Sequence, residues 1–139
     1  MAMADLSANG AAGVVRLQEI ATRQGISQPY LEQLFARLKR AGLVIGVRGP
    51  NGGYRLARPA GEVSVAEVIA AVDETIATNA CRVGGPVGCT GRQERCLTHN
   101  LWAALGRHIH DFLGDVTLAD VANGRVAPSR APEPVEARV

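Results

Sequence analysis

The chain has 139 residues, of which 47% are hydrophobic and 4% aromatic. This composition suffices for one domain with a core of Leu, Val, Ile and Ala, and a core so poor in aromatics favours a contribution from a second subunit. No run is long enough to span a membrane, and the opening MAMADLSANG lacks the basic and apolar regions of a secretion signal. The sequence therefore predicts a cytoplasmic protein that forms an oligomer.

The formal net charge of +2 hides a difference between two halves of the chain. Residues 1–60 carry eight Lys or Arg against three acids, whereas residues 61–139 carry seven against ten. The most biased window, residues 37–58, contains no acid and six basic residues: Arg37, Lys39, Arg40, Arg48, Arg55 and Arg58. Such a bias favours a polyanion as the partner, so we expect double-stranded nucleic acid.

Two adjacent segments have apolar residues at helical spacing. In residues 14–24 the stripe consists of Val14, Leu17, Ile20 and Ala21, and Gly25 follows where a helix commonly stops. Ser27 can cap a second helix ending at Gly42, with a stripe of Leu31, Leu34, Phe35 and Leu38. Two helices across a tight turn are typical of a helix-turn-helix, whose second helix presents its N-terminal residues to the major groove.

Residues 43–57 change to a strand pattern around the turn GPNG, which predicts a β-hairpin. A hairpin directly after a recognition helix is typical of a winged helix. Its tip carries Arg48 beside Gly49 and Gly52, where a guanidinium and flexible backbone can approach phosphates or a narrow minor groove.

A third helix is predicted from the capping box formed by Ser64 and Glu67, with a buried stripe of Val65, Val68, Ile69 and Val72. Residues 75–95 show no periodicity. The helical period resumes at Leu97, and the apolar face of this long helix consists of Leu101, Trp102, Leu105, Ile109, Phe112 and Leu113. Because a small domain cannot cover so broad a face, it predicts a dimerisation helix.

The predicted architecture is mainly α: a winged helix-turn-helix domain with a small hairpin wing, followed by a long C-terminal dimerisation helix. We divide the chain into a DNA-binding domain (1–74), a cofactor-binding loop (75–96), the long helix with a short terminal helix beginning near Thr117 (97–123), and a disordered tail (124–139).

All three cysteines lie close to one histidine in sequence. Seven residues separate Cys81 from Cys89, six separate Cys89 from Cys96, and two separate Cys96 from His99. Structural zinc sites usually bring ligands in tight pairs, and only the last pair qualifies. Wider, glycine-filled gaps leave enough backbone to surround a cofactor larger than one metal ion, and thiolates with one imidazole can hold an iron-sulfur cluster. A cluster is favoured over zinc, and both over three unrelated thiols.

No catalytic constellation is evident elsewhere. Residues 49–53 are glycine-rich but lack the lysine and hydroxyl that follow in a phosphate-binding loop. His108 and His110 fit a solvent-facing or interface position better than a ligand role. The sequence therefore predicts a protein that is not an enzyme.

At this point the residues resemble a known family, the IscR-like winged-helix repressors that sense iron-sulfur clusters. The likeness covers nearly all of residues 2–122, and its most telling stretches are RQGIS, YLEQLFARL, VRGPNGGYRL, EVIAAVDE and CLTHNLW. The resemblance implies a homodimeric transcription factor whose 2Fe-2S cluster is held by Cys81, Cys89, Cys96 and His99. In the family, cluster occupancy alters which promoters are bound, and the cluster-loaded protein represses cluster-assembly genes. Met1 aligns inside the family's first helix, so we expect that helix to be shortened.

The resemblance also marks residues for DNA contact. Glu32 matches the position that discriminates between promoter classes, and Gln33 and Arg48 match residues that touch DNA. The full candidate set lies in the recognition helix and the wing tip: Ser27, Gln28, Tyr30, Glu32, Gln33, Arg37, Arg48, Gly49, Asn51 and Gly52. Gln28 and Pro29 depart from the family's usual residues, and both wider cysteine gaps depart from its ligand spacing.

One hypothesis links the two sites: a carboxylate at Glu32 repels phosphates unless it is turned away or meets a cytosine amino group, and cluster binding could supply that turn. A solvated or capping role for Glu32 is the plain alternative. Two other functions remain open. One is a zinc- or thiol-based regulator on the same scaffold; the other is an electron-transfer protein, against which the basic window counts.

Overall fold

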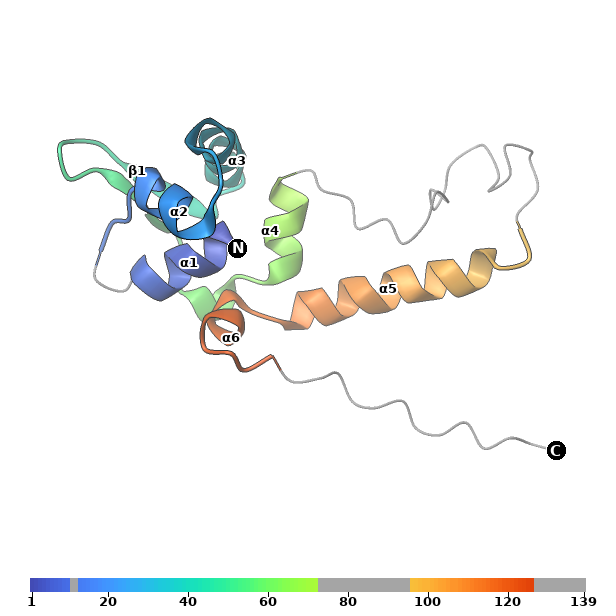
Figure 1. Ribbon diagram of the computed structural model, residues 1–139. Coiled ribbons are helices and arrows are strands. Elements are labelled where there is room, and N and C mark those ends of the chain that lie inside the picture. The colour runs from blue at the N-terminus through green and yellow to red at the C-terminus, as the bar shows by residue number, and fades with distance from the viewer. Residues whose placement is uncertain (11–12, 73–95, 127–139) are drawn as a thin grey trace.

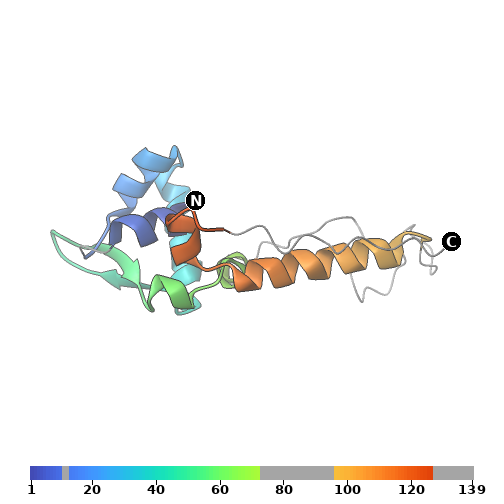
Figure 2. The same ribbon diagram turned by 90° about the horizontal axis from the view of Figure 1, so that it is seen from below.

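The computed structural model describes residues 1–10, 13–72 and 96–126. Its elements follow in this order: α1 (Ala2–Asn9), α2 (Leu17–Gln24), α3 (Gln28–Arg40), β1 (Val44–Val47), β2 (Gly53–Leu56), the 3-10 helix η2 (Ala60–Glu62), α4 (Val65–Ala71), α5 (His99–Asp115) and α6 (Leu118–Ala122). Figure 1 shows α1 to α4, the hairpin and α6 gathered in one body, from which α5 projects with its N-terminal end farthest away. The view in Figure 2 shows the same extension.

The core of the body forms where the first three helices meet the hairpin. Its fully buried side chains are Leu6, Ile20, Leu31, Phe35, Val44 and Val63. Strands β1 and β2 pair antiparallel from Val44 opposite Leu56 to Val47 opposite Gly53. The ring of Tyr54 packs edge-on against Phe35 at 5.0 Å between centroids, so the hairpin is fixed to α3 by an aromatic contact.

This arrangement confirms the predicted winged helix-turn-helix. Gly25 ends α2 in the left-handed conformation, the turn to α3 is tight, and the hairpin follows α3 directly. The capping box of Ser64 and Glu67 is present, and Thr117 caps α6 through a second box with Asp120.

Two details of the first helices differ from the prediction. Helix α2 begins at Leu17, not Val14, because Val15 pairs as an isolated β-bridge with Tyr54. Ser27 occupies the N-cap position of α3, but its side chain makes no capping hydrogen bond. An N-cap oxygen normally accepts from the second or third helical N–H, and the second helical residue here is Pro29, which has none.

Helix α6 belongs to the body, although the sequence grouped it with the long helix. It packs against α1, and Leu118 is part of the core. The backbone holds it there, because Val65 N donates to Val116 O at 2.9 Å and Leu118 N donates to Val63 O at 2.9 Å. The first and last helices of the described chain, α1 and α6, therefore pack against each other.

Helix α5 has no buried residue. It packs against α4 near the body, and its predicted apolar face stays open: 63% of Leu101, 36% of Trp102 and 40% of Leu105 are exposed. Leu97, predicted to open the helix, precedes it and is fully exposed. Residues 75–95 and the tail beyond residue 126 lie outside the described residues. No helix in the described part is long and apolar enough to cross a membrane.

Candidate nucleic-acid interface and metal ligands

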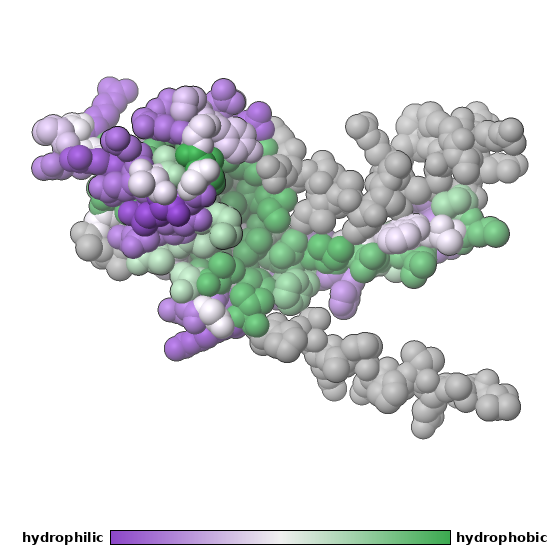
Figure 3. Space-filling model, viewed as in Figure 1, coloured by the Kyte–Doolittle hydropathy of each residue, from purple (hydrophilic) through white to green (hydrophobic). Residues whose placement is uncertain are grey.

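The outer face of α3 carries most of the residues predicted to meet DNA. Leu31, Phe35 and Leu38 are buried and fix the side of the helix that faces the core. The other side is exposed and presents Ser27, Gln28, Tyr30, Glu32, Gln33 and Arg37. Figure 3 shows hydrophilic residues gathered over α2, α3 and the wing. A polar helix face of this kind can enter a major groove.

Glu32 has a partner on the same helix. Gln28 Nε2 donates to Glu32 Oε1 at 3.0 Å, one turn earlier. Both side chains are exposed, so the contact is compatible with the plain alternative of a solvated helix charge. Glu32 lies one turn into α3, where it can repel a phosphate or accept from a cytosine amino group.

The wing tip spans residues 48–52. Gly52 N donates to Gly49 O at 2.9 Å and closes the turn. Arg48, Gly49 and Asn51 are exposed, and Gly52 is half-buried. Arg48 forms no hydrogen bond or ion pair with any described residue, so its guanidinium donors remain available for phosphate oxygens.

Three arginines of the basic window form hydrogen bonds within the protein, and one of them, Arg40, bonds among the described residues only to Ala36 O of its own helix at 3.4 Å. Arg58 forms an ion pair with Glu67 of α4 at 2.8 Å, which lowers the pKa of that carboxyl. Arg37 Nη1 donates to Val72 O at 2.7 Å, so it joins α3 to the C-terminal end of α4. The sequence bias of the window does not distinguish these paired arginines from Arg48, which has no partner among the described residues.

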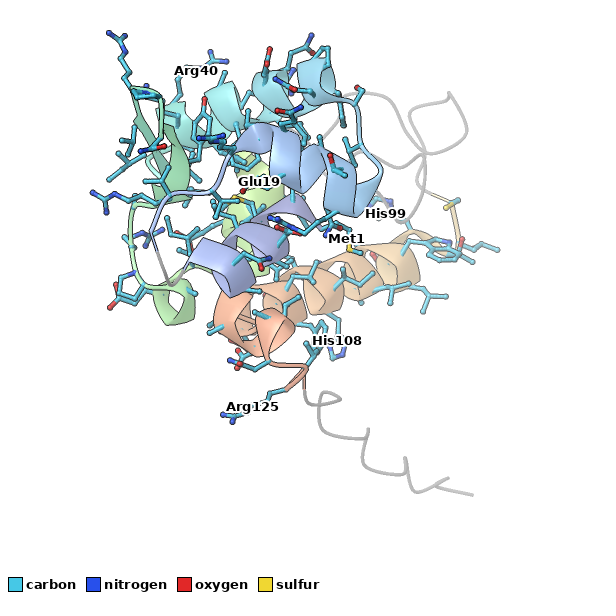
Figure 4. All side chains as sticks on the ribbon, turned by 60° about the vertical axis from the view of Figure 1, so that its left-hand side comes forward. Met1, Glu19, Arg40, His99, His108 and Arg125 are labelled. Carbon is cyan, nitrogen blue, oxygen red and sulfur yellow. The ribbon has the colours of Figure 1, made fainter. Side chains whose placement is uncertain are left out.

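Of the predicted metal ligands, the structure describes Cys96 and His99. His99 N donates to Cys96 O at 3.0 Å, so both residues belong to one turn at the start of α5. Both are half-buried, and the Cys96 thiol lies 3.5 Å from Thr98 Oγ1. Figure 4 labels His99 at this end of the helix. Cys81 and Cys89 lie outside the described residues, and no group of three possible ligands occurs in the remainder.

Two side-chain networks were not foreseen. Arg16 Nη2 donates to Pro50 O of the wing tip at 2.8 Å. In α1, Asp5 is 7% exposed and accepts from Arg23 at 2.6 to 3.1 Å and from Gln24 at 2.8 Å. The hydrogen bonds from Arg23 hold the pKa of Asp5 below its ordinary value. Nothing in the sequence indicates either contact, because the partners are 18 or more residues apart.

The fold and the exposed α3 face define a winged-helix DNA-binding protein. Comparison with known proteins narrows this class. A profile of the Rrf2 family, described as "Iron-dependent Transcriptional regulator", matches residues 1–124. The HTH-type transcriptional regulator IscR of Cronobacter sakazakii is 48% identical over 124 residues, covering 89% of this chain and 75% of that protein. The same regulator of Citrobacter koseri has equal identity and 74% coverage.

Solved structures of transcriptional regulators resemble this chain as well. IscR of T. potens has a TM-score of 0.70 and 33% identity, covering 94% of this chain and 85% of that one. CymR, the global cysteine regulator of B. subtilis, has a TM-score of 0.71 and 27% identity, with 88% of both chains covered. The chain belongs to the Rrf2 family and is a DNA-binding transcriptional regulator, not an enzyme.

Proposed function

We propose that this protein is a homodimeric repressor whose DNA binding responds to a 2Fe-2S cluster, and that it controls genes of iron-sulfur cluster assembly. The observation that carries the proposal is the Cys96–His99 pair on one turn of a chain 48% identical to regulators named IscR. Cys81 and Cys89 would complete the ligand set.

The chemistry of this pair fits the cofactor. Thiolates are the usual ligands of iron-sulfur clusters, and when bound, such a cluster with a histidine ligand supplies a centre of raised reduction potential. Cys96 and His99 are half-buried and lie outside the hydrophobic core, so both residues are partly open to the surroundings of the helix. The backbone bond between them fixes their spacing before any ligand binds.

The DNA-binding surface in this proposal consists of the exposed face of α3 and the wing tip. Glu32 and Gln33 would face base edges and Arg48 a phosphate or the minor groove. Ser27, Gln28, Tyr30, Gly49, Asn51 and Gly52 complete the surface.

Arg37 offers a route between the two sites. Its bond to Val72 O links the recognition helix to the last described residue before the cysteine segment. A displacement of Val72 would therefore be transmitted to α3 through this hydrogen bond. The homodimer in this proposal forms through the open apolar face of α5.

The cofactor is tested by anaerobic purification with visible absorption and analysis of iron and acid-labile sulfide. We expect iron and sulfide in equal amounts, and their loss in Cys96→Ala. His99→Ala should shift the absorption or lose the cluster, whereas His108→Ala, on an exposed position of the same helix, should leave both unchanged. Stoichiometric zinc without sulfide would contradict the proposal.

That last outcome would favour the second candidate, a zinc- or thiol-based regulator. The specific observation behind it is the likeness to CymR, since the oxidized form of Staphylococcus aureus CymR matches with a TM-score of 0.67 and 30% identity. A reduced dithiol or a zinc site would then replace the cluster.

The wing assignment is tested by Arg48→Ala. We expect weaker DNA binding and a slope of log affinity against log salt that is flatter by about one, because one phosphate contact is lost. An unchanged affinity and slope would remove Arg48 from the interface.

A further inference from the structure

Arg16 lies outside the basic window, at the start of the first helix of the helix-turn-helix, yet its side chain reaches the wing tip. It is the N-cap residue of α2, with an extended backbone at φ −79° and ψ 141°. Its Nη2 atom donates to Pro50 O at 2.8 Å and lies 3.5 Å from Asn51 Oδ1. The contact joins residues 34 and 35 positions apart, beside the residues that we expect to meet DNA.

The backbone before α2 brings Arg16 to this position. Val15 N donates to Tyr54 O at 2.9 Å and Tyr54 N donates to Val15 O at 2.8 Å, so the segment runs along β2. The approach depends on a glycine, because a Cβ at Gly53 would lie 2.4 Å from Val15 O. Any side chain there would push the two segments apart.

The base and the tip of the wing are held by different contacts. The base is fixed to α3 through Tyr54 and Phe35. Strand pairing ends at Val47 opposite Gly53, so residues 48–52 extend beyond the sheet. In the described part of the chain, Arg16 is the side chain that bonds to this tip from outside the hairpin.

We propose that Arg16 is a positioning residue for DNA binding: it holds the wing tip in the orientation in which Arg48 and Asn51 meet the duplex. Without this contact the tip samples more conformations, and binding must order it. The inference rests on the family's DNA binding and not on the cluster, so it stands or fails independently of the cofactor proposal.

A direct contact between Arg16 and a phosphate is the rival role, since an exposed guanidinium has further donors. The two roles differ in their dependence on Arg48. A positioning residue acts through the tip, so most of its effect is lost when Arg48 is absent, and only the part that acts through Asn51 remains. A phosphate contact adds its own loss in either background and lowers the salt slope by about one.

The test uses the full chain and a DNA duplex selected by the wild-type protein from a randomised pool. Binding is measured by fluorescence anisotropy across a salt series for Arg16→Ala, Arg48→Ala and the double variant. We expect Arg16→Ala to weaken binding about threefold to tenfold. In the Arg48→Ala background the same change should cost less than about twofold and leave the salt slope unaltered.

Arg125→Ala is the matched control, because it removes one exposed arginine at the end of the body opposite Arg40 and the recognition helix (Figure 4). Its affinity should equal that of the wild type. Arg16→Lys keeps the charge but loses the planar guanidinium, and we expect an intermediate loss with no change of slope. Thermal unfolding of each variant, expected at the wild-type temperature, separates positioning from misfolding.

Two results would overturn the proposal. One is an unchanged affinity for Arg16→Ala. The other is an equal loss in both backgrounds together with a lower salt slope, which would make Arg16 a phosphate contact.

Discussion

The body and helix α5 have similar apolar residues but bury them to different extents. In the body, Leu6, Ile20 and Phe35 are completely inaccessible to solvent. In α5 no residue is buried, and Leu101 keeps 63% of its surface exposed. Helical periodicity predicts both kinds of helix equally well, and it does not say what covers the apolar stripe. The apolar residues of the body are covered by its own elements, whereas the face of α5 stays open in the described chain, and in our proposal a second copy covers it.

The largest effect should come from the centre of the body. Replacing Phe35 with Ala removes a fully buried ring and its edge contact with Tyr54, and we expect a loss of about 3–5 kcal/mol in the free energy of unfolding. Urea titration followed by circular dichroism measures it. A cost below about 1 kcal/mol would mean that the core around this ring is loosely packed.

The matched change in α5 is Trp102→Ala. Trp102 is 36% exposed and lies outside the core, so the same truncation should leave the unfolding of the body nearly unchanged at low protein concentration. If Trp102→Ala instead destabilised the protein as much as Phe35→Ala at every concentration, α5 would be part of the body's core and the contrast would be wrong.

A second change tests what covers α5. Leu101→Glu places a carboxylate in the open apolar face, and in a dimer this charge would be buried without a partner. We expect the dissociation constant of the homodimer to rise more than about tenfold, as measured by sedimentation equilibrium. Arg107→Glu, at an exposed position of the same helix, controls for net charge. A wild-type monomer, or a Leu101→Glu dimer of full strength, would contradict the assignment.

Local patterns account for what the sequence predicted well. The capping box of Ser64 and Glu67 spans three residues, and the stripe of α3 repeats every three or four, so both are readable without the fold. Cys96 and His99 are likewise three residues apart and lie on one turn. Because these contacts form within one helical turn, spacing alone places them together.

The features that the sequence did not predict all depend on tertiary contacts. The pairing of Val15 with Tyr54 delays the start of α2, although Val14 fits the helical period. The bond from Arg16 to Pro50 O likewise joins segments that no periodicity relates. Ring and hydrogen-bond partners of this kind depend on how the hairpin packs against α3 and the segment before α2, which no local spacing encodes. For the same reason the sequence could list the basic residues of the window but could not separate Arg58, which pairs with Glu67, from Arg48.

A third change tests the polar contact between α1 and α2. Asp5→Asn removes the charge that Arg23 contacts at 2.6 Å, and we expect a loss of about 1–2 kcal/mol at neutral pH. Since the folded-state pKa of Asp5 lies below its ordinary 3.8, the stabilisation is present above that pH and is lost as the pH falls through the folded value. The difference between wild type and variant should therefore shrink below about pH 4.

The control lies in α5. Asp111 has a side chain that is 79% exposed, and Asp111→Asn should change the unfolding free energy by less than about 0.5 kcal/mol at any pH. Equal effects of the two aspartates would show that burial beside Arg23 adds nothing.

The smallest effect should come from the surface of the body. The Arg58–Glu67 pair is 2.8 Å long, but both side chains are more than 40% exposed, so solvent screens the attraction. Arg58→Ala should lower the free energy of unfolding by less than about 1 kcal/mol. Because Arg58 lowers the pKa of Glu67, this stabilisation is present above pH 4.5 and is lost as the pH falls through the folded-state value. The variant should also weaken DNA binding less than Arg48→Ala, since the guanidinium of Arg58 is already paired. If Arg58→Ala and Arg48→Ala weakened DNA binding equally, Arg58 would also contact DNA. If Arg58→Ala lowered the free energy of unfolding nearly as much as Phe35→Ala, surface charge would stabilise the body as much as its apolar core does.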